Sequence, residues 1–111
     1  MNRQAKKYLF DVVQTIDRIE EIFKSTPDFN SYQQNFVLRM ATERLLGIVG
    51  EAVSKYDKIP GVPTLSFTPQ IIGFRNIIVH DYAKVLDAVV WEIVYAHLPL
   101  LKSEADALLN E

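Results

Sequence analysis

The residues best suited to chemistry lie in one short string, which contains Arg75, Asn76, His80 and Tyr82. A guanidinium group is always charged, and its fork of N–H donors matches the oxygens of a phosphate. Imidazole is the side chain that both accepts and donates a proton near neutral pH. A cation and an acid/base group this close together can act on a phosphodiester.

Helix geometry limits how one copy of the string can work. Successive residues of an ideal helix point about 100° apart, so Arg75 and Tyr82 diverge by about 20° but Arg75 and His80 by about 140°. One ideal helix therefore does not aim Arg75 and His80 at one point. Either the helix loosens around His80, or a second copy of the chain completes the site, because a two-fold dimer places identical segments side by side.

The composition limits the classes of protein to which the chain can belong. The chain has 111 residues, 49% of them hydrophobic, which predicts a single domain over residues 1–111. It has no cysteine, so it forms neither a disulfide framework nor a thiolate metal site. No apolar run reaches the roughly 18 residues of a membrane span, and no signal-peptide pattern is present, so we expect a soluble, cytoplasmic protein. Because the net charge is −2, any contact with nucleic acid must be local.

The apolar residues follow a helical rhythm in the first half of the chain. A spacing of three and four positions predicts an amphipathic helix from about residue 3 to 24. A proline-containing stretch at 25–31 breaks it, and a longer helix follows from about 32 to 56. Gly47 and Gly50 lie inside this longer helix, where each costs about 1 kcal/mol relative to alanine. Either another backbone approaches closely there, or the glycines face solvent, where they are tolerated.

The second half of the chain begins with a loop at 57–67. Thr68 then supplies an N-cap hydroxyl and Pro69 a proline at the first helical position, so a third helix begins near Pro69. This helix carries the Arg75 string in its C-terminal half. No strand-like alternation appears anywhere.

A fourth helix begins around Leu86 or Asp87, and its first turns are apolar almost all round, which predicts burial on several sides and offers a surface for a dimer. Pro99 should kink or restart it. The fold class is therefore all-α, an antiparallel bundle of four to five helices.

Arg75-Asn76, three further residues, His80 and then Tyr82 resemble the Arg-polar-x3-His signature of the HEPN superfamily. The added tyrosine makes the chain similar to HepT-like toxins, which pair with minimal nucleotidyltransferase antitoxins. The resemblance covers essentially the whole chain. Beyond the string it includes Arg39-Met40-Ala41-Thr42-Glu43-Arg44, Gly50-Glu51-Ala52, Gly73-Phe74, Trp91 and Leu98-Pro99.

The resemblance implies a dimeric HEPN-like bundle and an RNase that needs no metal or other cofactor. His80 would act as general acid/base, Arg75 would stabilise the charge on the pentavalent phosphorane, and Asn76 would orient either group. The products would carry cyclic phosphate ends. Tyr82 is the residue that such antitoxins modify with adenylate. Because Tyr82 and Arg75 share a face of the ideal helix, we expect that adenylate to lie beside the guanidinium.

Each residue of the string also has a purely structural interpretation. Arg75 could be an ordinary surface cation. His80 could complement the dipole at the end of its helix. Tyr82 could be an aromatic residue of the core or of an interface, and this role is compatible with modification. The register of all three residues favours the functional interpretation.

Other polar residues have simpler explanations. Glu51, with Arg44 and Lys55 on the same helix, is most simply part of a surface ion-pair ladder, and the Gly-Glu-Ala match keeps it as a supporting candidate. Asp81 is expected to be a solvated helix-end residue, and His97 a packed core or interface histidine. The two histidines lack the spacing of a zinc motif, so no metal site is expected.

Three functions remain. The first is a metal-independent RNase toxin that cleaves RNA and is held silent by a nucleotidyltransferase antitoxin. The second is a non-catalytic nucleotide- or RNA-binding module of a nucleotidyltransferase complex, and the third is a helical dimer that only scaffolds assembly. His80 favours catalysis, because a phosphate-binding site gains more from lysine or arginine than from a partly charged imidazole.

Overall fold

The computed structural model describes residues 1–111 and begins with α1 (Arg3–Phe23). The side chain of Asn2 caps this helix by accepting a hydrogen bond from the N–H of Ala5 at 2.7 Å. One face of α1 is buried, and the predicted amphipathic helix is confirmed. The buried residues of this face are Ala5, Leu9, Val12, Thr15, Ile16, Ile19 and Phe23.

The predicted second helix is two helices, α2 (Phe29–Gln34) and α3 (Phe36–Asp57), so the expected start near residue 32 is wrong. Asp28 caps α2, because its carboxylate accepts the N–H of Ser31 at 2.8 Å. Asn35 then separates the two helices with an extended backbone, and its side chain accepts the N–H of Leu38 at 3.0 Å. Polar caps have allowed the helix to stop and restart within one residue.

α4 (Thr68–His80) begins one residue earlier than predicted, and Thr68 is not its N-cap. The hydroxyl of Thr68 donates to the carbonyl of Leu65 at 2.7 Å instead. Phe67 occupies the cap position in the left-handed region, with φ of 65° and no side-chain hydrogen bond. A short helical turn, η1 (Tyr82–Lys84), follows α4.

The last helical stretch consists of α5 (Asp87–Glu92), the π-helical turn η2 (Ile93–His97) and α6 (Leu98–Leu109). Its start at Asp87 is confirmed. The wide turn η2 lies where the ring of Pro99 would otherwise crowd the preceding turn, so the helix continues rather than breaks. Val90, Ile93 and Val94 are buried, as the apolar pattern predicts, whereas Val89 is 38% exposed and Tyr95 is 49% exposed.

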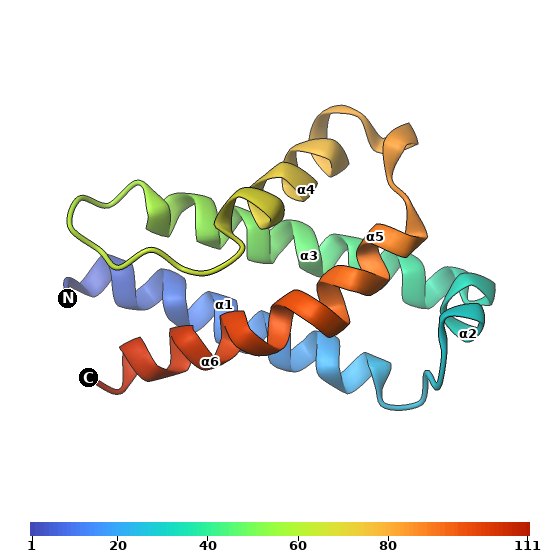
Figure 1. The fold of residues 1–111 in the computed structure, drawn as a ribbon, viewed down its shortest axis with the longest axis horizontal. Coiled ribbons are helices and arrows are strands. Elements are labelled where there is room, and N and C mark those ends of the chain that lie inside the picture. Colours follow the sequence, from blue (N-terminus) through green and yellow to red (C-terminus); the bar gives the residue numbers. More distant parts are fainter.

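The helices form the predicted all-α bundle, with α1 between α3 and α6 and with α4 leaning on α3 (Figure 1). Both termini lie at the same end of the bundle. No helix has the length and apolar character needed to span a bilayer. Twenty-two buried hydrophobic residues form one core that joins these helices.

Gly50 lets α4 lie directly against α3. A Cβ atom at Gly50 would overlap the Cβ of Arg75 and would lie 3.2 Å from the carbonyl oxygen of Ile71. A Cβ at Gly47 would meet nothing within 4 Å. The predicted close approach is therefore confirmed at Gly50, whereas open space beside Gly47 fits the alternative that glycine is tolerated there.

This difference gives a matched pair of substitutions on one helix. Gly50→Ala should destabilise the chain by about 1–3 kcal/mol, because α4 and Arg75 must move away. Gly47→Ala should stabilise it by up to about 1 kcal/mol through helix propensity alone. Urea unfolding followed by circular dichroism measures both. A Gly50→Ala chain as stable as Gly47→Ala would contradict the packing of α4 on α3.

Candidate active site

Arg75 lies on the side of α4 that faces α3, and two neighbours fix its guanidinium. Its Nη2 lies 2.7 Å from Oε2 of Glu51, and its Nη1 donates to Oδ1 of Asn76 at 3.1 Å. The Arg75 side chain is 28% exposed, so part of the guanidinium remains open to solvent. Glu51 also lies 3.4 Å from Lys55, as the ladder predicts, but Arg44 forms no ion pair with it. Glu51 therefore pairs more closely with Arg75 than with Lys55.

Arg75 lines a groove of about 390 Å³ between α1, α3 and α4. The charged residues of its walls are mixed in sign, which limits any attraction for nucleic acid to particular points in the groove. A tyrosine, Tyr8, adds an aromatic surface. The basic residues are Lys7, Arg44, Lys55 and Arg75, and the acidic residues are Asp11, Glu43 and Glu51.

His80 is the last residue of α4, is exposed, and does not line the groove. The helix does not loosen before it, because the N–H of Asp81 still donates to the carbonyl of Ile77 at 2.9 Å. The ideal-helix separation of Arg75 and His80 therefore applies, and of the two explanations offered for it, loosening is wrong. Completion of the site by a second copy of the chain stays a prediction.

Tyr82 lies beyond the helix, and its expected position beside Arg75 is wrong. Asp81 turns the chain with φ of −153°, and the Tyr82 hydroxyl then donates to Oε1 of Glu43 at 2.6 Å. Met40 Sδ lies 3.5 Å from the same hydroxyl. The hydrogen bond to Glu43 raises the pKa of Tyr82 above that of an ordinary tyrosine, because the carboxylate favours the protonated phenol.

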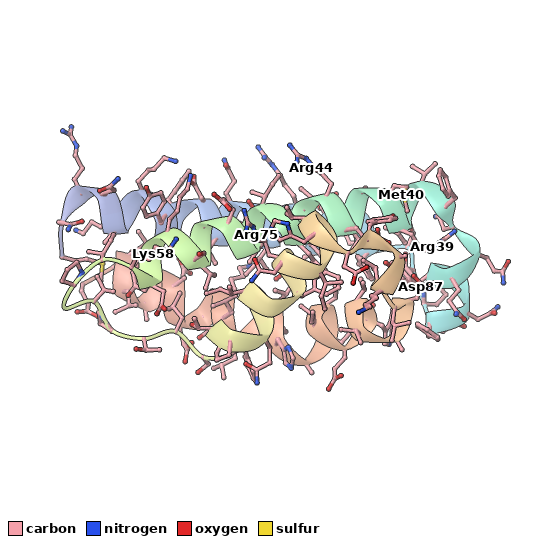
Figure 2. The ribbon with its side chains drawn as sticks, turned by 90° about the horizontal axis from the view of Figure 1, so that it is seen from above. Arg39, Met40, Arg44, Lys58, Arg75 and Asp87 are labelled. Carbon is pink, nitrogen blue, oxygen red and sulfur yellow. The ribbon has the colours of Figure 1, made fainter.

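Tyr82 also faces a different hollow. It is 52% exposed, which excludes a core position within one chain, and it lines a space of about 620 Å³ together with Arg39, Glu43 and Asp87. Figure 2 shows Arg39 and Asp87 toward one end of the bundle, while Arg75 lies near its middle. The string therefore contributes to two sites, with Glu43 lining both.

Glu43 and Arg39 are polar residues to which the sequence assigned no role. Glu43 is only 5% exposed, and Nε of Arg39 is buried without a hydrogen-bond partner. Both belong to the segment that resembles HepT-like proteins. Their spacing of four residues, which puts them on one side of α3, was the available signal.

The two remaining polar predictions are confirmed. Asp81 is exposed and forms an ion pair with Lys84 at 3.1 Å, as a solvated helix-end residue does. His97 stacks on Phe67 with ring centroids 4.2 Å apart, and its Nδ1 is buried, so it is a packed histidine. No group of three His, Asp or Glu side chains is arranged to hold a metal ion.

The helical bundle carries Arg75, Asn76 and His80 in the C-terminal half of α4. A family model described as "Ribonuclease HepT-like" matches residues 12–108, so the chain belongs to the HepT-like ribonuclease family. The predicted HepT-like family and all-α bundle are confirmed, whereas the dimer and the pairing with an antitoxin stay predictions.

Curated relatives cover the chain almost end to end. "Putative RNase MJ1380" from Methanocaldococcus jannaschii is 32% identical over 94% of this chain and 95% of its own length. "Putative RNase MJ0125" from the same organism is 27% identical over 98% of this chain and 94% of its own. "Putative RNase TTE0752" from Caldanaerobacter subterraneus subsp. tengcongensis is 26% identical over 98% and 97%. No solved structure matches the chain significantly.

Proposed function

We propose that the chain is a metal-independent RNase toxin that cleaves RNA with Arg75, Asn76 and His80 and is silenced when a partner nucleotidyltransferase adenylylates Tyr82. Membership of the HepT-like ribonuclease family and the names of its relatives support RNA as the substrate. The observation that carries the catalytic proposal is the fixed guanidinium of Arg75 in the groove, held by Glu51 and Asn76.

The proposed reaction transfers a phosphodiester within the RNA. The ribose 2′-oxygen attacks phosphorus, the bond from phosphorus to the 5′-oxygen breaks, and a cyclic phosphate forms. His80 accepts the proton of the 2′-hydroxyl or protonates the leaving oxygen. Arg75 stabilises the charge on the phosphoryl oxygens. Because Oδ1 of Asn76 already accepts from Arg75, its amide N–H groups remain to donate to RNA.

A homodimer with a composite site accounts best for the position of His80. Arg75 points into the groove, whereas His80 ends the same helix outside it. The end of α4 and the segment around the start of α5 also expose apolar side chains that a second copy could cover. These are Ile77, Val79, Leu86 and Val89. Arg75 of one subunit and His80 of the partner subunit would then act on one phosphodiester.

The direct test of the function is purified protein on total RNA in excess EDTA. Cleavage should persist at the rate seen without chelator, because the proposed groups supply both the charge and the proton transfer. Activity that disappears with EDTA and returns with a divalent cation would contradict it.

Adenylylation of Tyr82 should lower RNase activity by disturbing the turn after His80. An adenylate replaces the phenol proton, so the hydrogen bond to Glu43 is lost, and a phosphodiester charge is placed against that buried carboxylate. Incubation with ATP and the nucleotidyltransferase should add adenylate mass at Tyr82 and reduce cleavage.

Tyr82→Phe is the matched variant for this experiment, because it keeps the ring and lacks only the oxygen. It should remain an active RNase and escape silencing by ATP and the nucleotidyltransferase. If the nucleotidyltransferase and ATP silence Tyr82→Phe as fully as the wild type, inhibition works by capping the site in the complex and not by modification.

A further inference from the structure

We infer that Tyr82, Glu43 and Arg39 form a second site for phosphoryl chemistry, in which Glu43 accepts the phenol proton and Arg39 binds the incoming adenylyl phosphate. The inference rests on the proposed modification of Tyr82 and assigns the residues that make this tyrosine reactive. The site shares Glu43 with the groove of Arg75, whereas Tyr82 and Arg39 line only the hollow of about 620 Å³.

Glu43 has the position that a proton acceptor needs. Its Oε1 lies 2.6 Å from the hydroxyl oxygen of Tyr82, a distance typical of a charge-assisted O–H···O bond. The residue is almost fully buried on α3, so its carboxylate is held in place rather than swinging in solvent. A general base must be within hydrogen-bond reach of the proton that it removes, and Glu43 already is.

Arg39 is a cation without an anionic partner at the same hollow. It lies one helical turn before Glu43, a spacing at which arginine and glutamate commonly pair, yet the two form no ion pair. Its guanidinium lies 5.7 Å from the ring of Phe36, and its Nε is buried without a hydrogen-bond partner. No side-chain hydrogen bond or ion pair occupies its Nη groups, so these can bind the oxygens of a phosphate in the hollow.

The hollow can also receive the rest of a nucleotide. Besides its charged residues it is lined by Phe29, Val85 and Leu86, which give an apolar wall beside the polar groups. Nucleotide sites commonly combine such walls with a few convergent polar groups. The volume of about 620 Å³ lies in the range of small-molecule sites.

The chemical step is a nucleophilic substitution at phosphorus. Oη of Tyr82 attacks the α-phosphorus of ATP, the bond from that phosphorus to the bridging oxygen breaks, and pyrophosphate leaves. The phenol proton passes to Glu43, and Arg39 faces the charge that builds up on the non-bridging oxygens. The nucleotidyltransferase would supply the bound ATP, whereas these residues belong to the acceptor chain.

A reagent that needs no partner tests the site itself. Adenosine 5′-phosphorimidazolide transfers adenylate to a hydroxyl with loss of imidazole, and peptide mass spectrometry gives the rate at each tyrosine. Tyr95 is an internal control, because it is 49% exposed against 52% for Tyr82 and lacks a carboxylate partner. Tyr82 should react about 10²-fold faster than Tyr95. Equal rates at the two tyrosines in the wild-type chain would overturn the inference without any variant.

The dependence of the rate on pH separates a base from a merely structural contact. Tyr82 is faced by Glu43 and Arg39 from α3, by Asp87 from α5 and by Tyr32 from α2. With Glu43 accepting the proton, the Tyr82 rate should not follow the phenolate fraction. In Glu43→Gln the rate should be lower, and it should increase with pH as the phenolate fraction does. An unchanged rate and slope in Glu43→Gln would remove Glu43 from the step.

Arg39→Ala tests the phosphate-binding role, with Arg18→Ala as the matched control. Arg18 is exposed on α1 and lines neither the groove nor the hollow. Arg39→Ala should slow labelling of Tyr82 by about 10²-fold and leave Tyr95 unchanged, whereas Arg18→Ala should change neither. Equal labelling in both variants would overturn the role of Arg39.

The same variants distinguish this inference from the proposed function. If the phosphorimidazolide labels Tyr82 through Glu43 but the nucleotidyltransferase and ATP add no mass, the chemistry of the site stands and the proposed silencing fails. If the nucleotidyltransferase modifies Tyr82 equally well in Glu43→Gln and Arg39→Ala, the silencing stands and the inference fails.

Discussion

His80→Ala should lower the rate of RNA cleavage by about 10²–10⁴, the usual contribution of a general acid/base. Arg75→Ala should lower it by about 10²–10³, the usual contribution of one group that stabilises transition-state charge. Neither change should unfold the chain. His80 is exposed at the end of α4, and the Arg75 ion pair is open enough to solvent to contribute little stability.

Initial rates on a defined RNA, together with thermal unfolding of each variant, measure these effects. Arg18→Ala is the control for the loss of one positive charge, because it lies outside both cavities. The cleavage rate of Arg75→Ala must be well below that of Arg18→Ala. Otherwise the effect is a general weakening of RNA attraction and not a loss of catalysis. Wild-type rates in His80→Ala would exclude it as the acid/base group.

Mixing the two inactive chains should restore cleavage if the site is composite. Random exchange makes about half of the dimers mixed, and each mixed dimer joins an intact Arg75 to an intact His80 at one of its two sites. The mixture should therefore recover about a quarter of wild-type activity, from two samples that are each inactive. The expectation comes from the position of His80 outside the groove that Arg75 lines.

Sedimentation and a tag on one chain would establish that mixed dimers form. If they form and remain inactive, each site belongs to a single subunit, and His80 must reach Arg75 by a change within α4. A chain that sediments as a monomer at the concentrations of the assay would reject the composite site altogether.

The sequence predicted the helices because their signals are local. The apolar spacing of α1 and the start of α5 at Asp87 both depend on residues adjacent in the chain. The same local reasoning failed where one residue redirects the backbone. Asn35 divides α2 from α3, and Asp81 ends the helical geometry on which the expected position of Tyr82 depended.

The contacts between helices were harder to predict. Gly50 indicated a close approach but could not name Arg75 as the neighbour, and the pairing of Arg75 with Glu51 depends on how α4 leans on α3. The residues next to Glu43 in the sequence give no sign that it has a special role. Its importance appears only when a residue 39 positions later in the chain donates a hydrogen bond to it.

The chemical ends of the cleaved RNA test the central claim most directly. Purified wild-type protein, incubated with a defined RNA in excess EDTA, should give fragments that end in a 2′,3′-cyclic phosphate and begin with a 5′-hydroxyl, because the 2′-oxygen is the nucleophile. Mass spectrometry of the fragments identifies both ends. Fragments with a 3′-hydroxyl and a 5′-phosphate would show that water attacked phosphorus, and the mechanism proposed for Arg75 and His80 would be wrong.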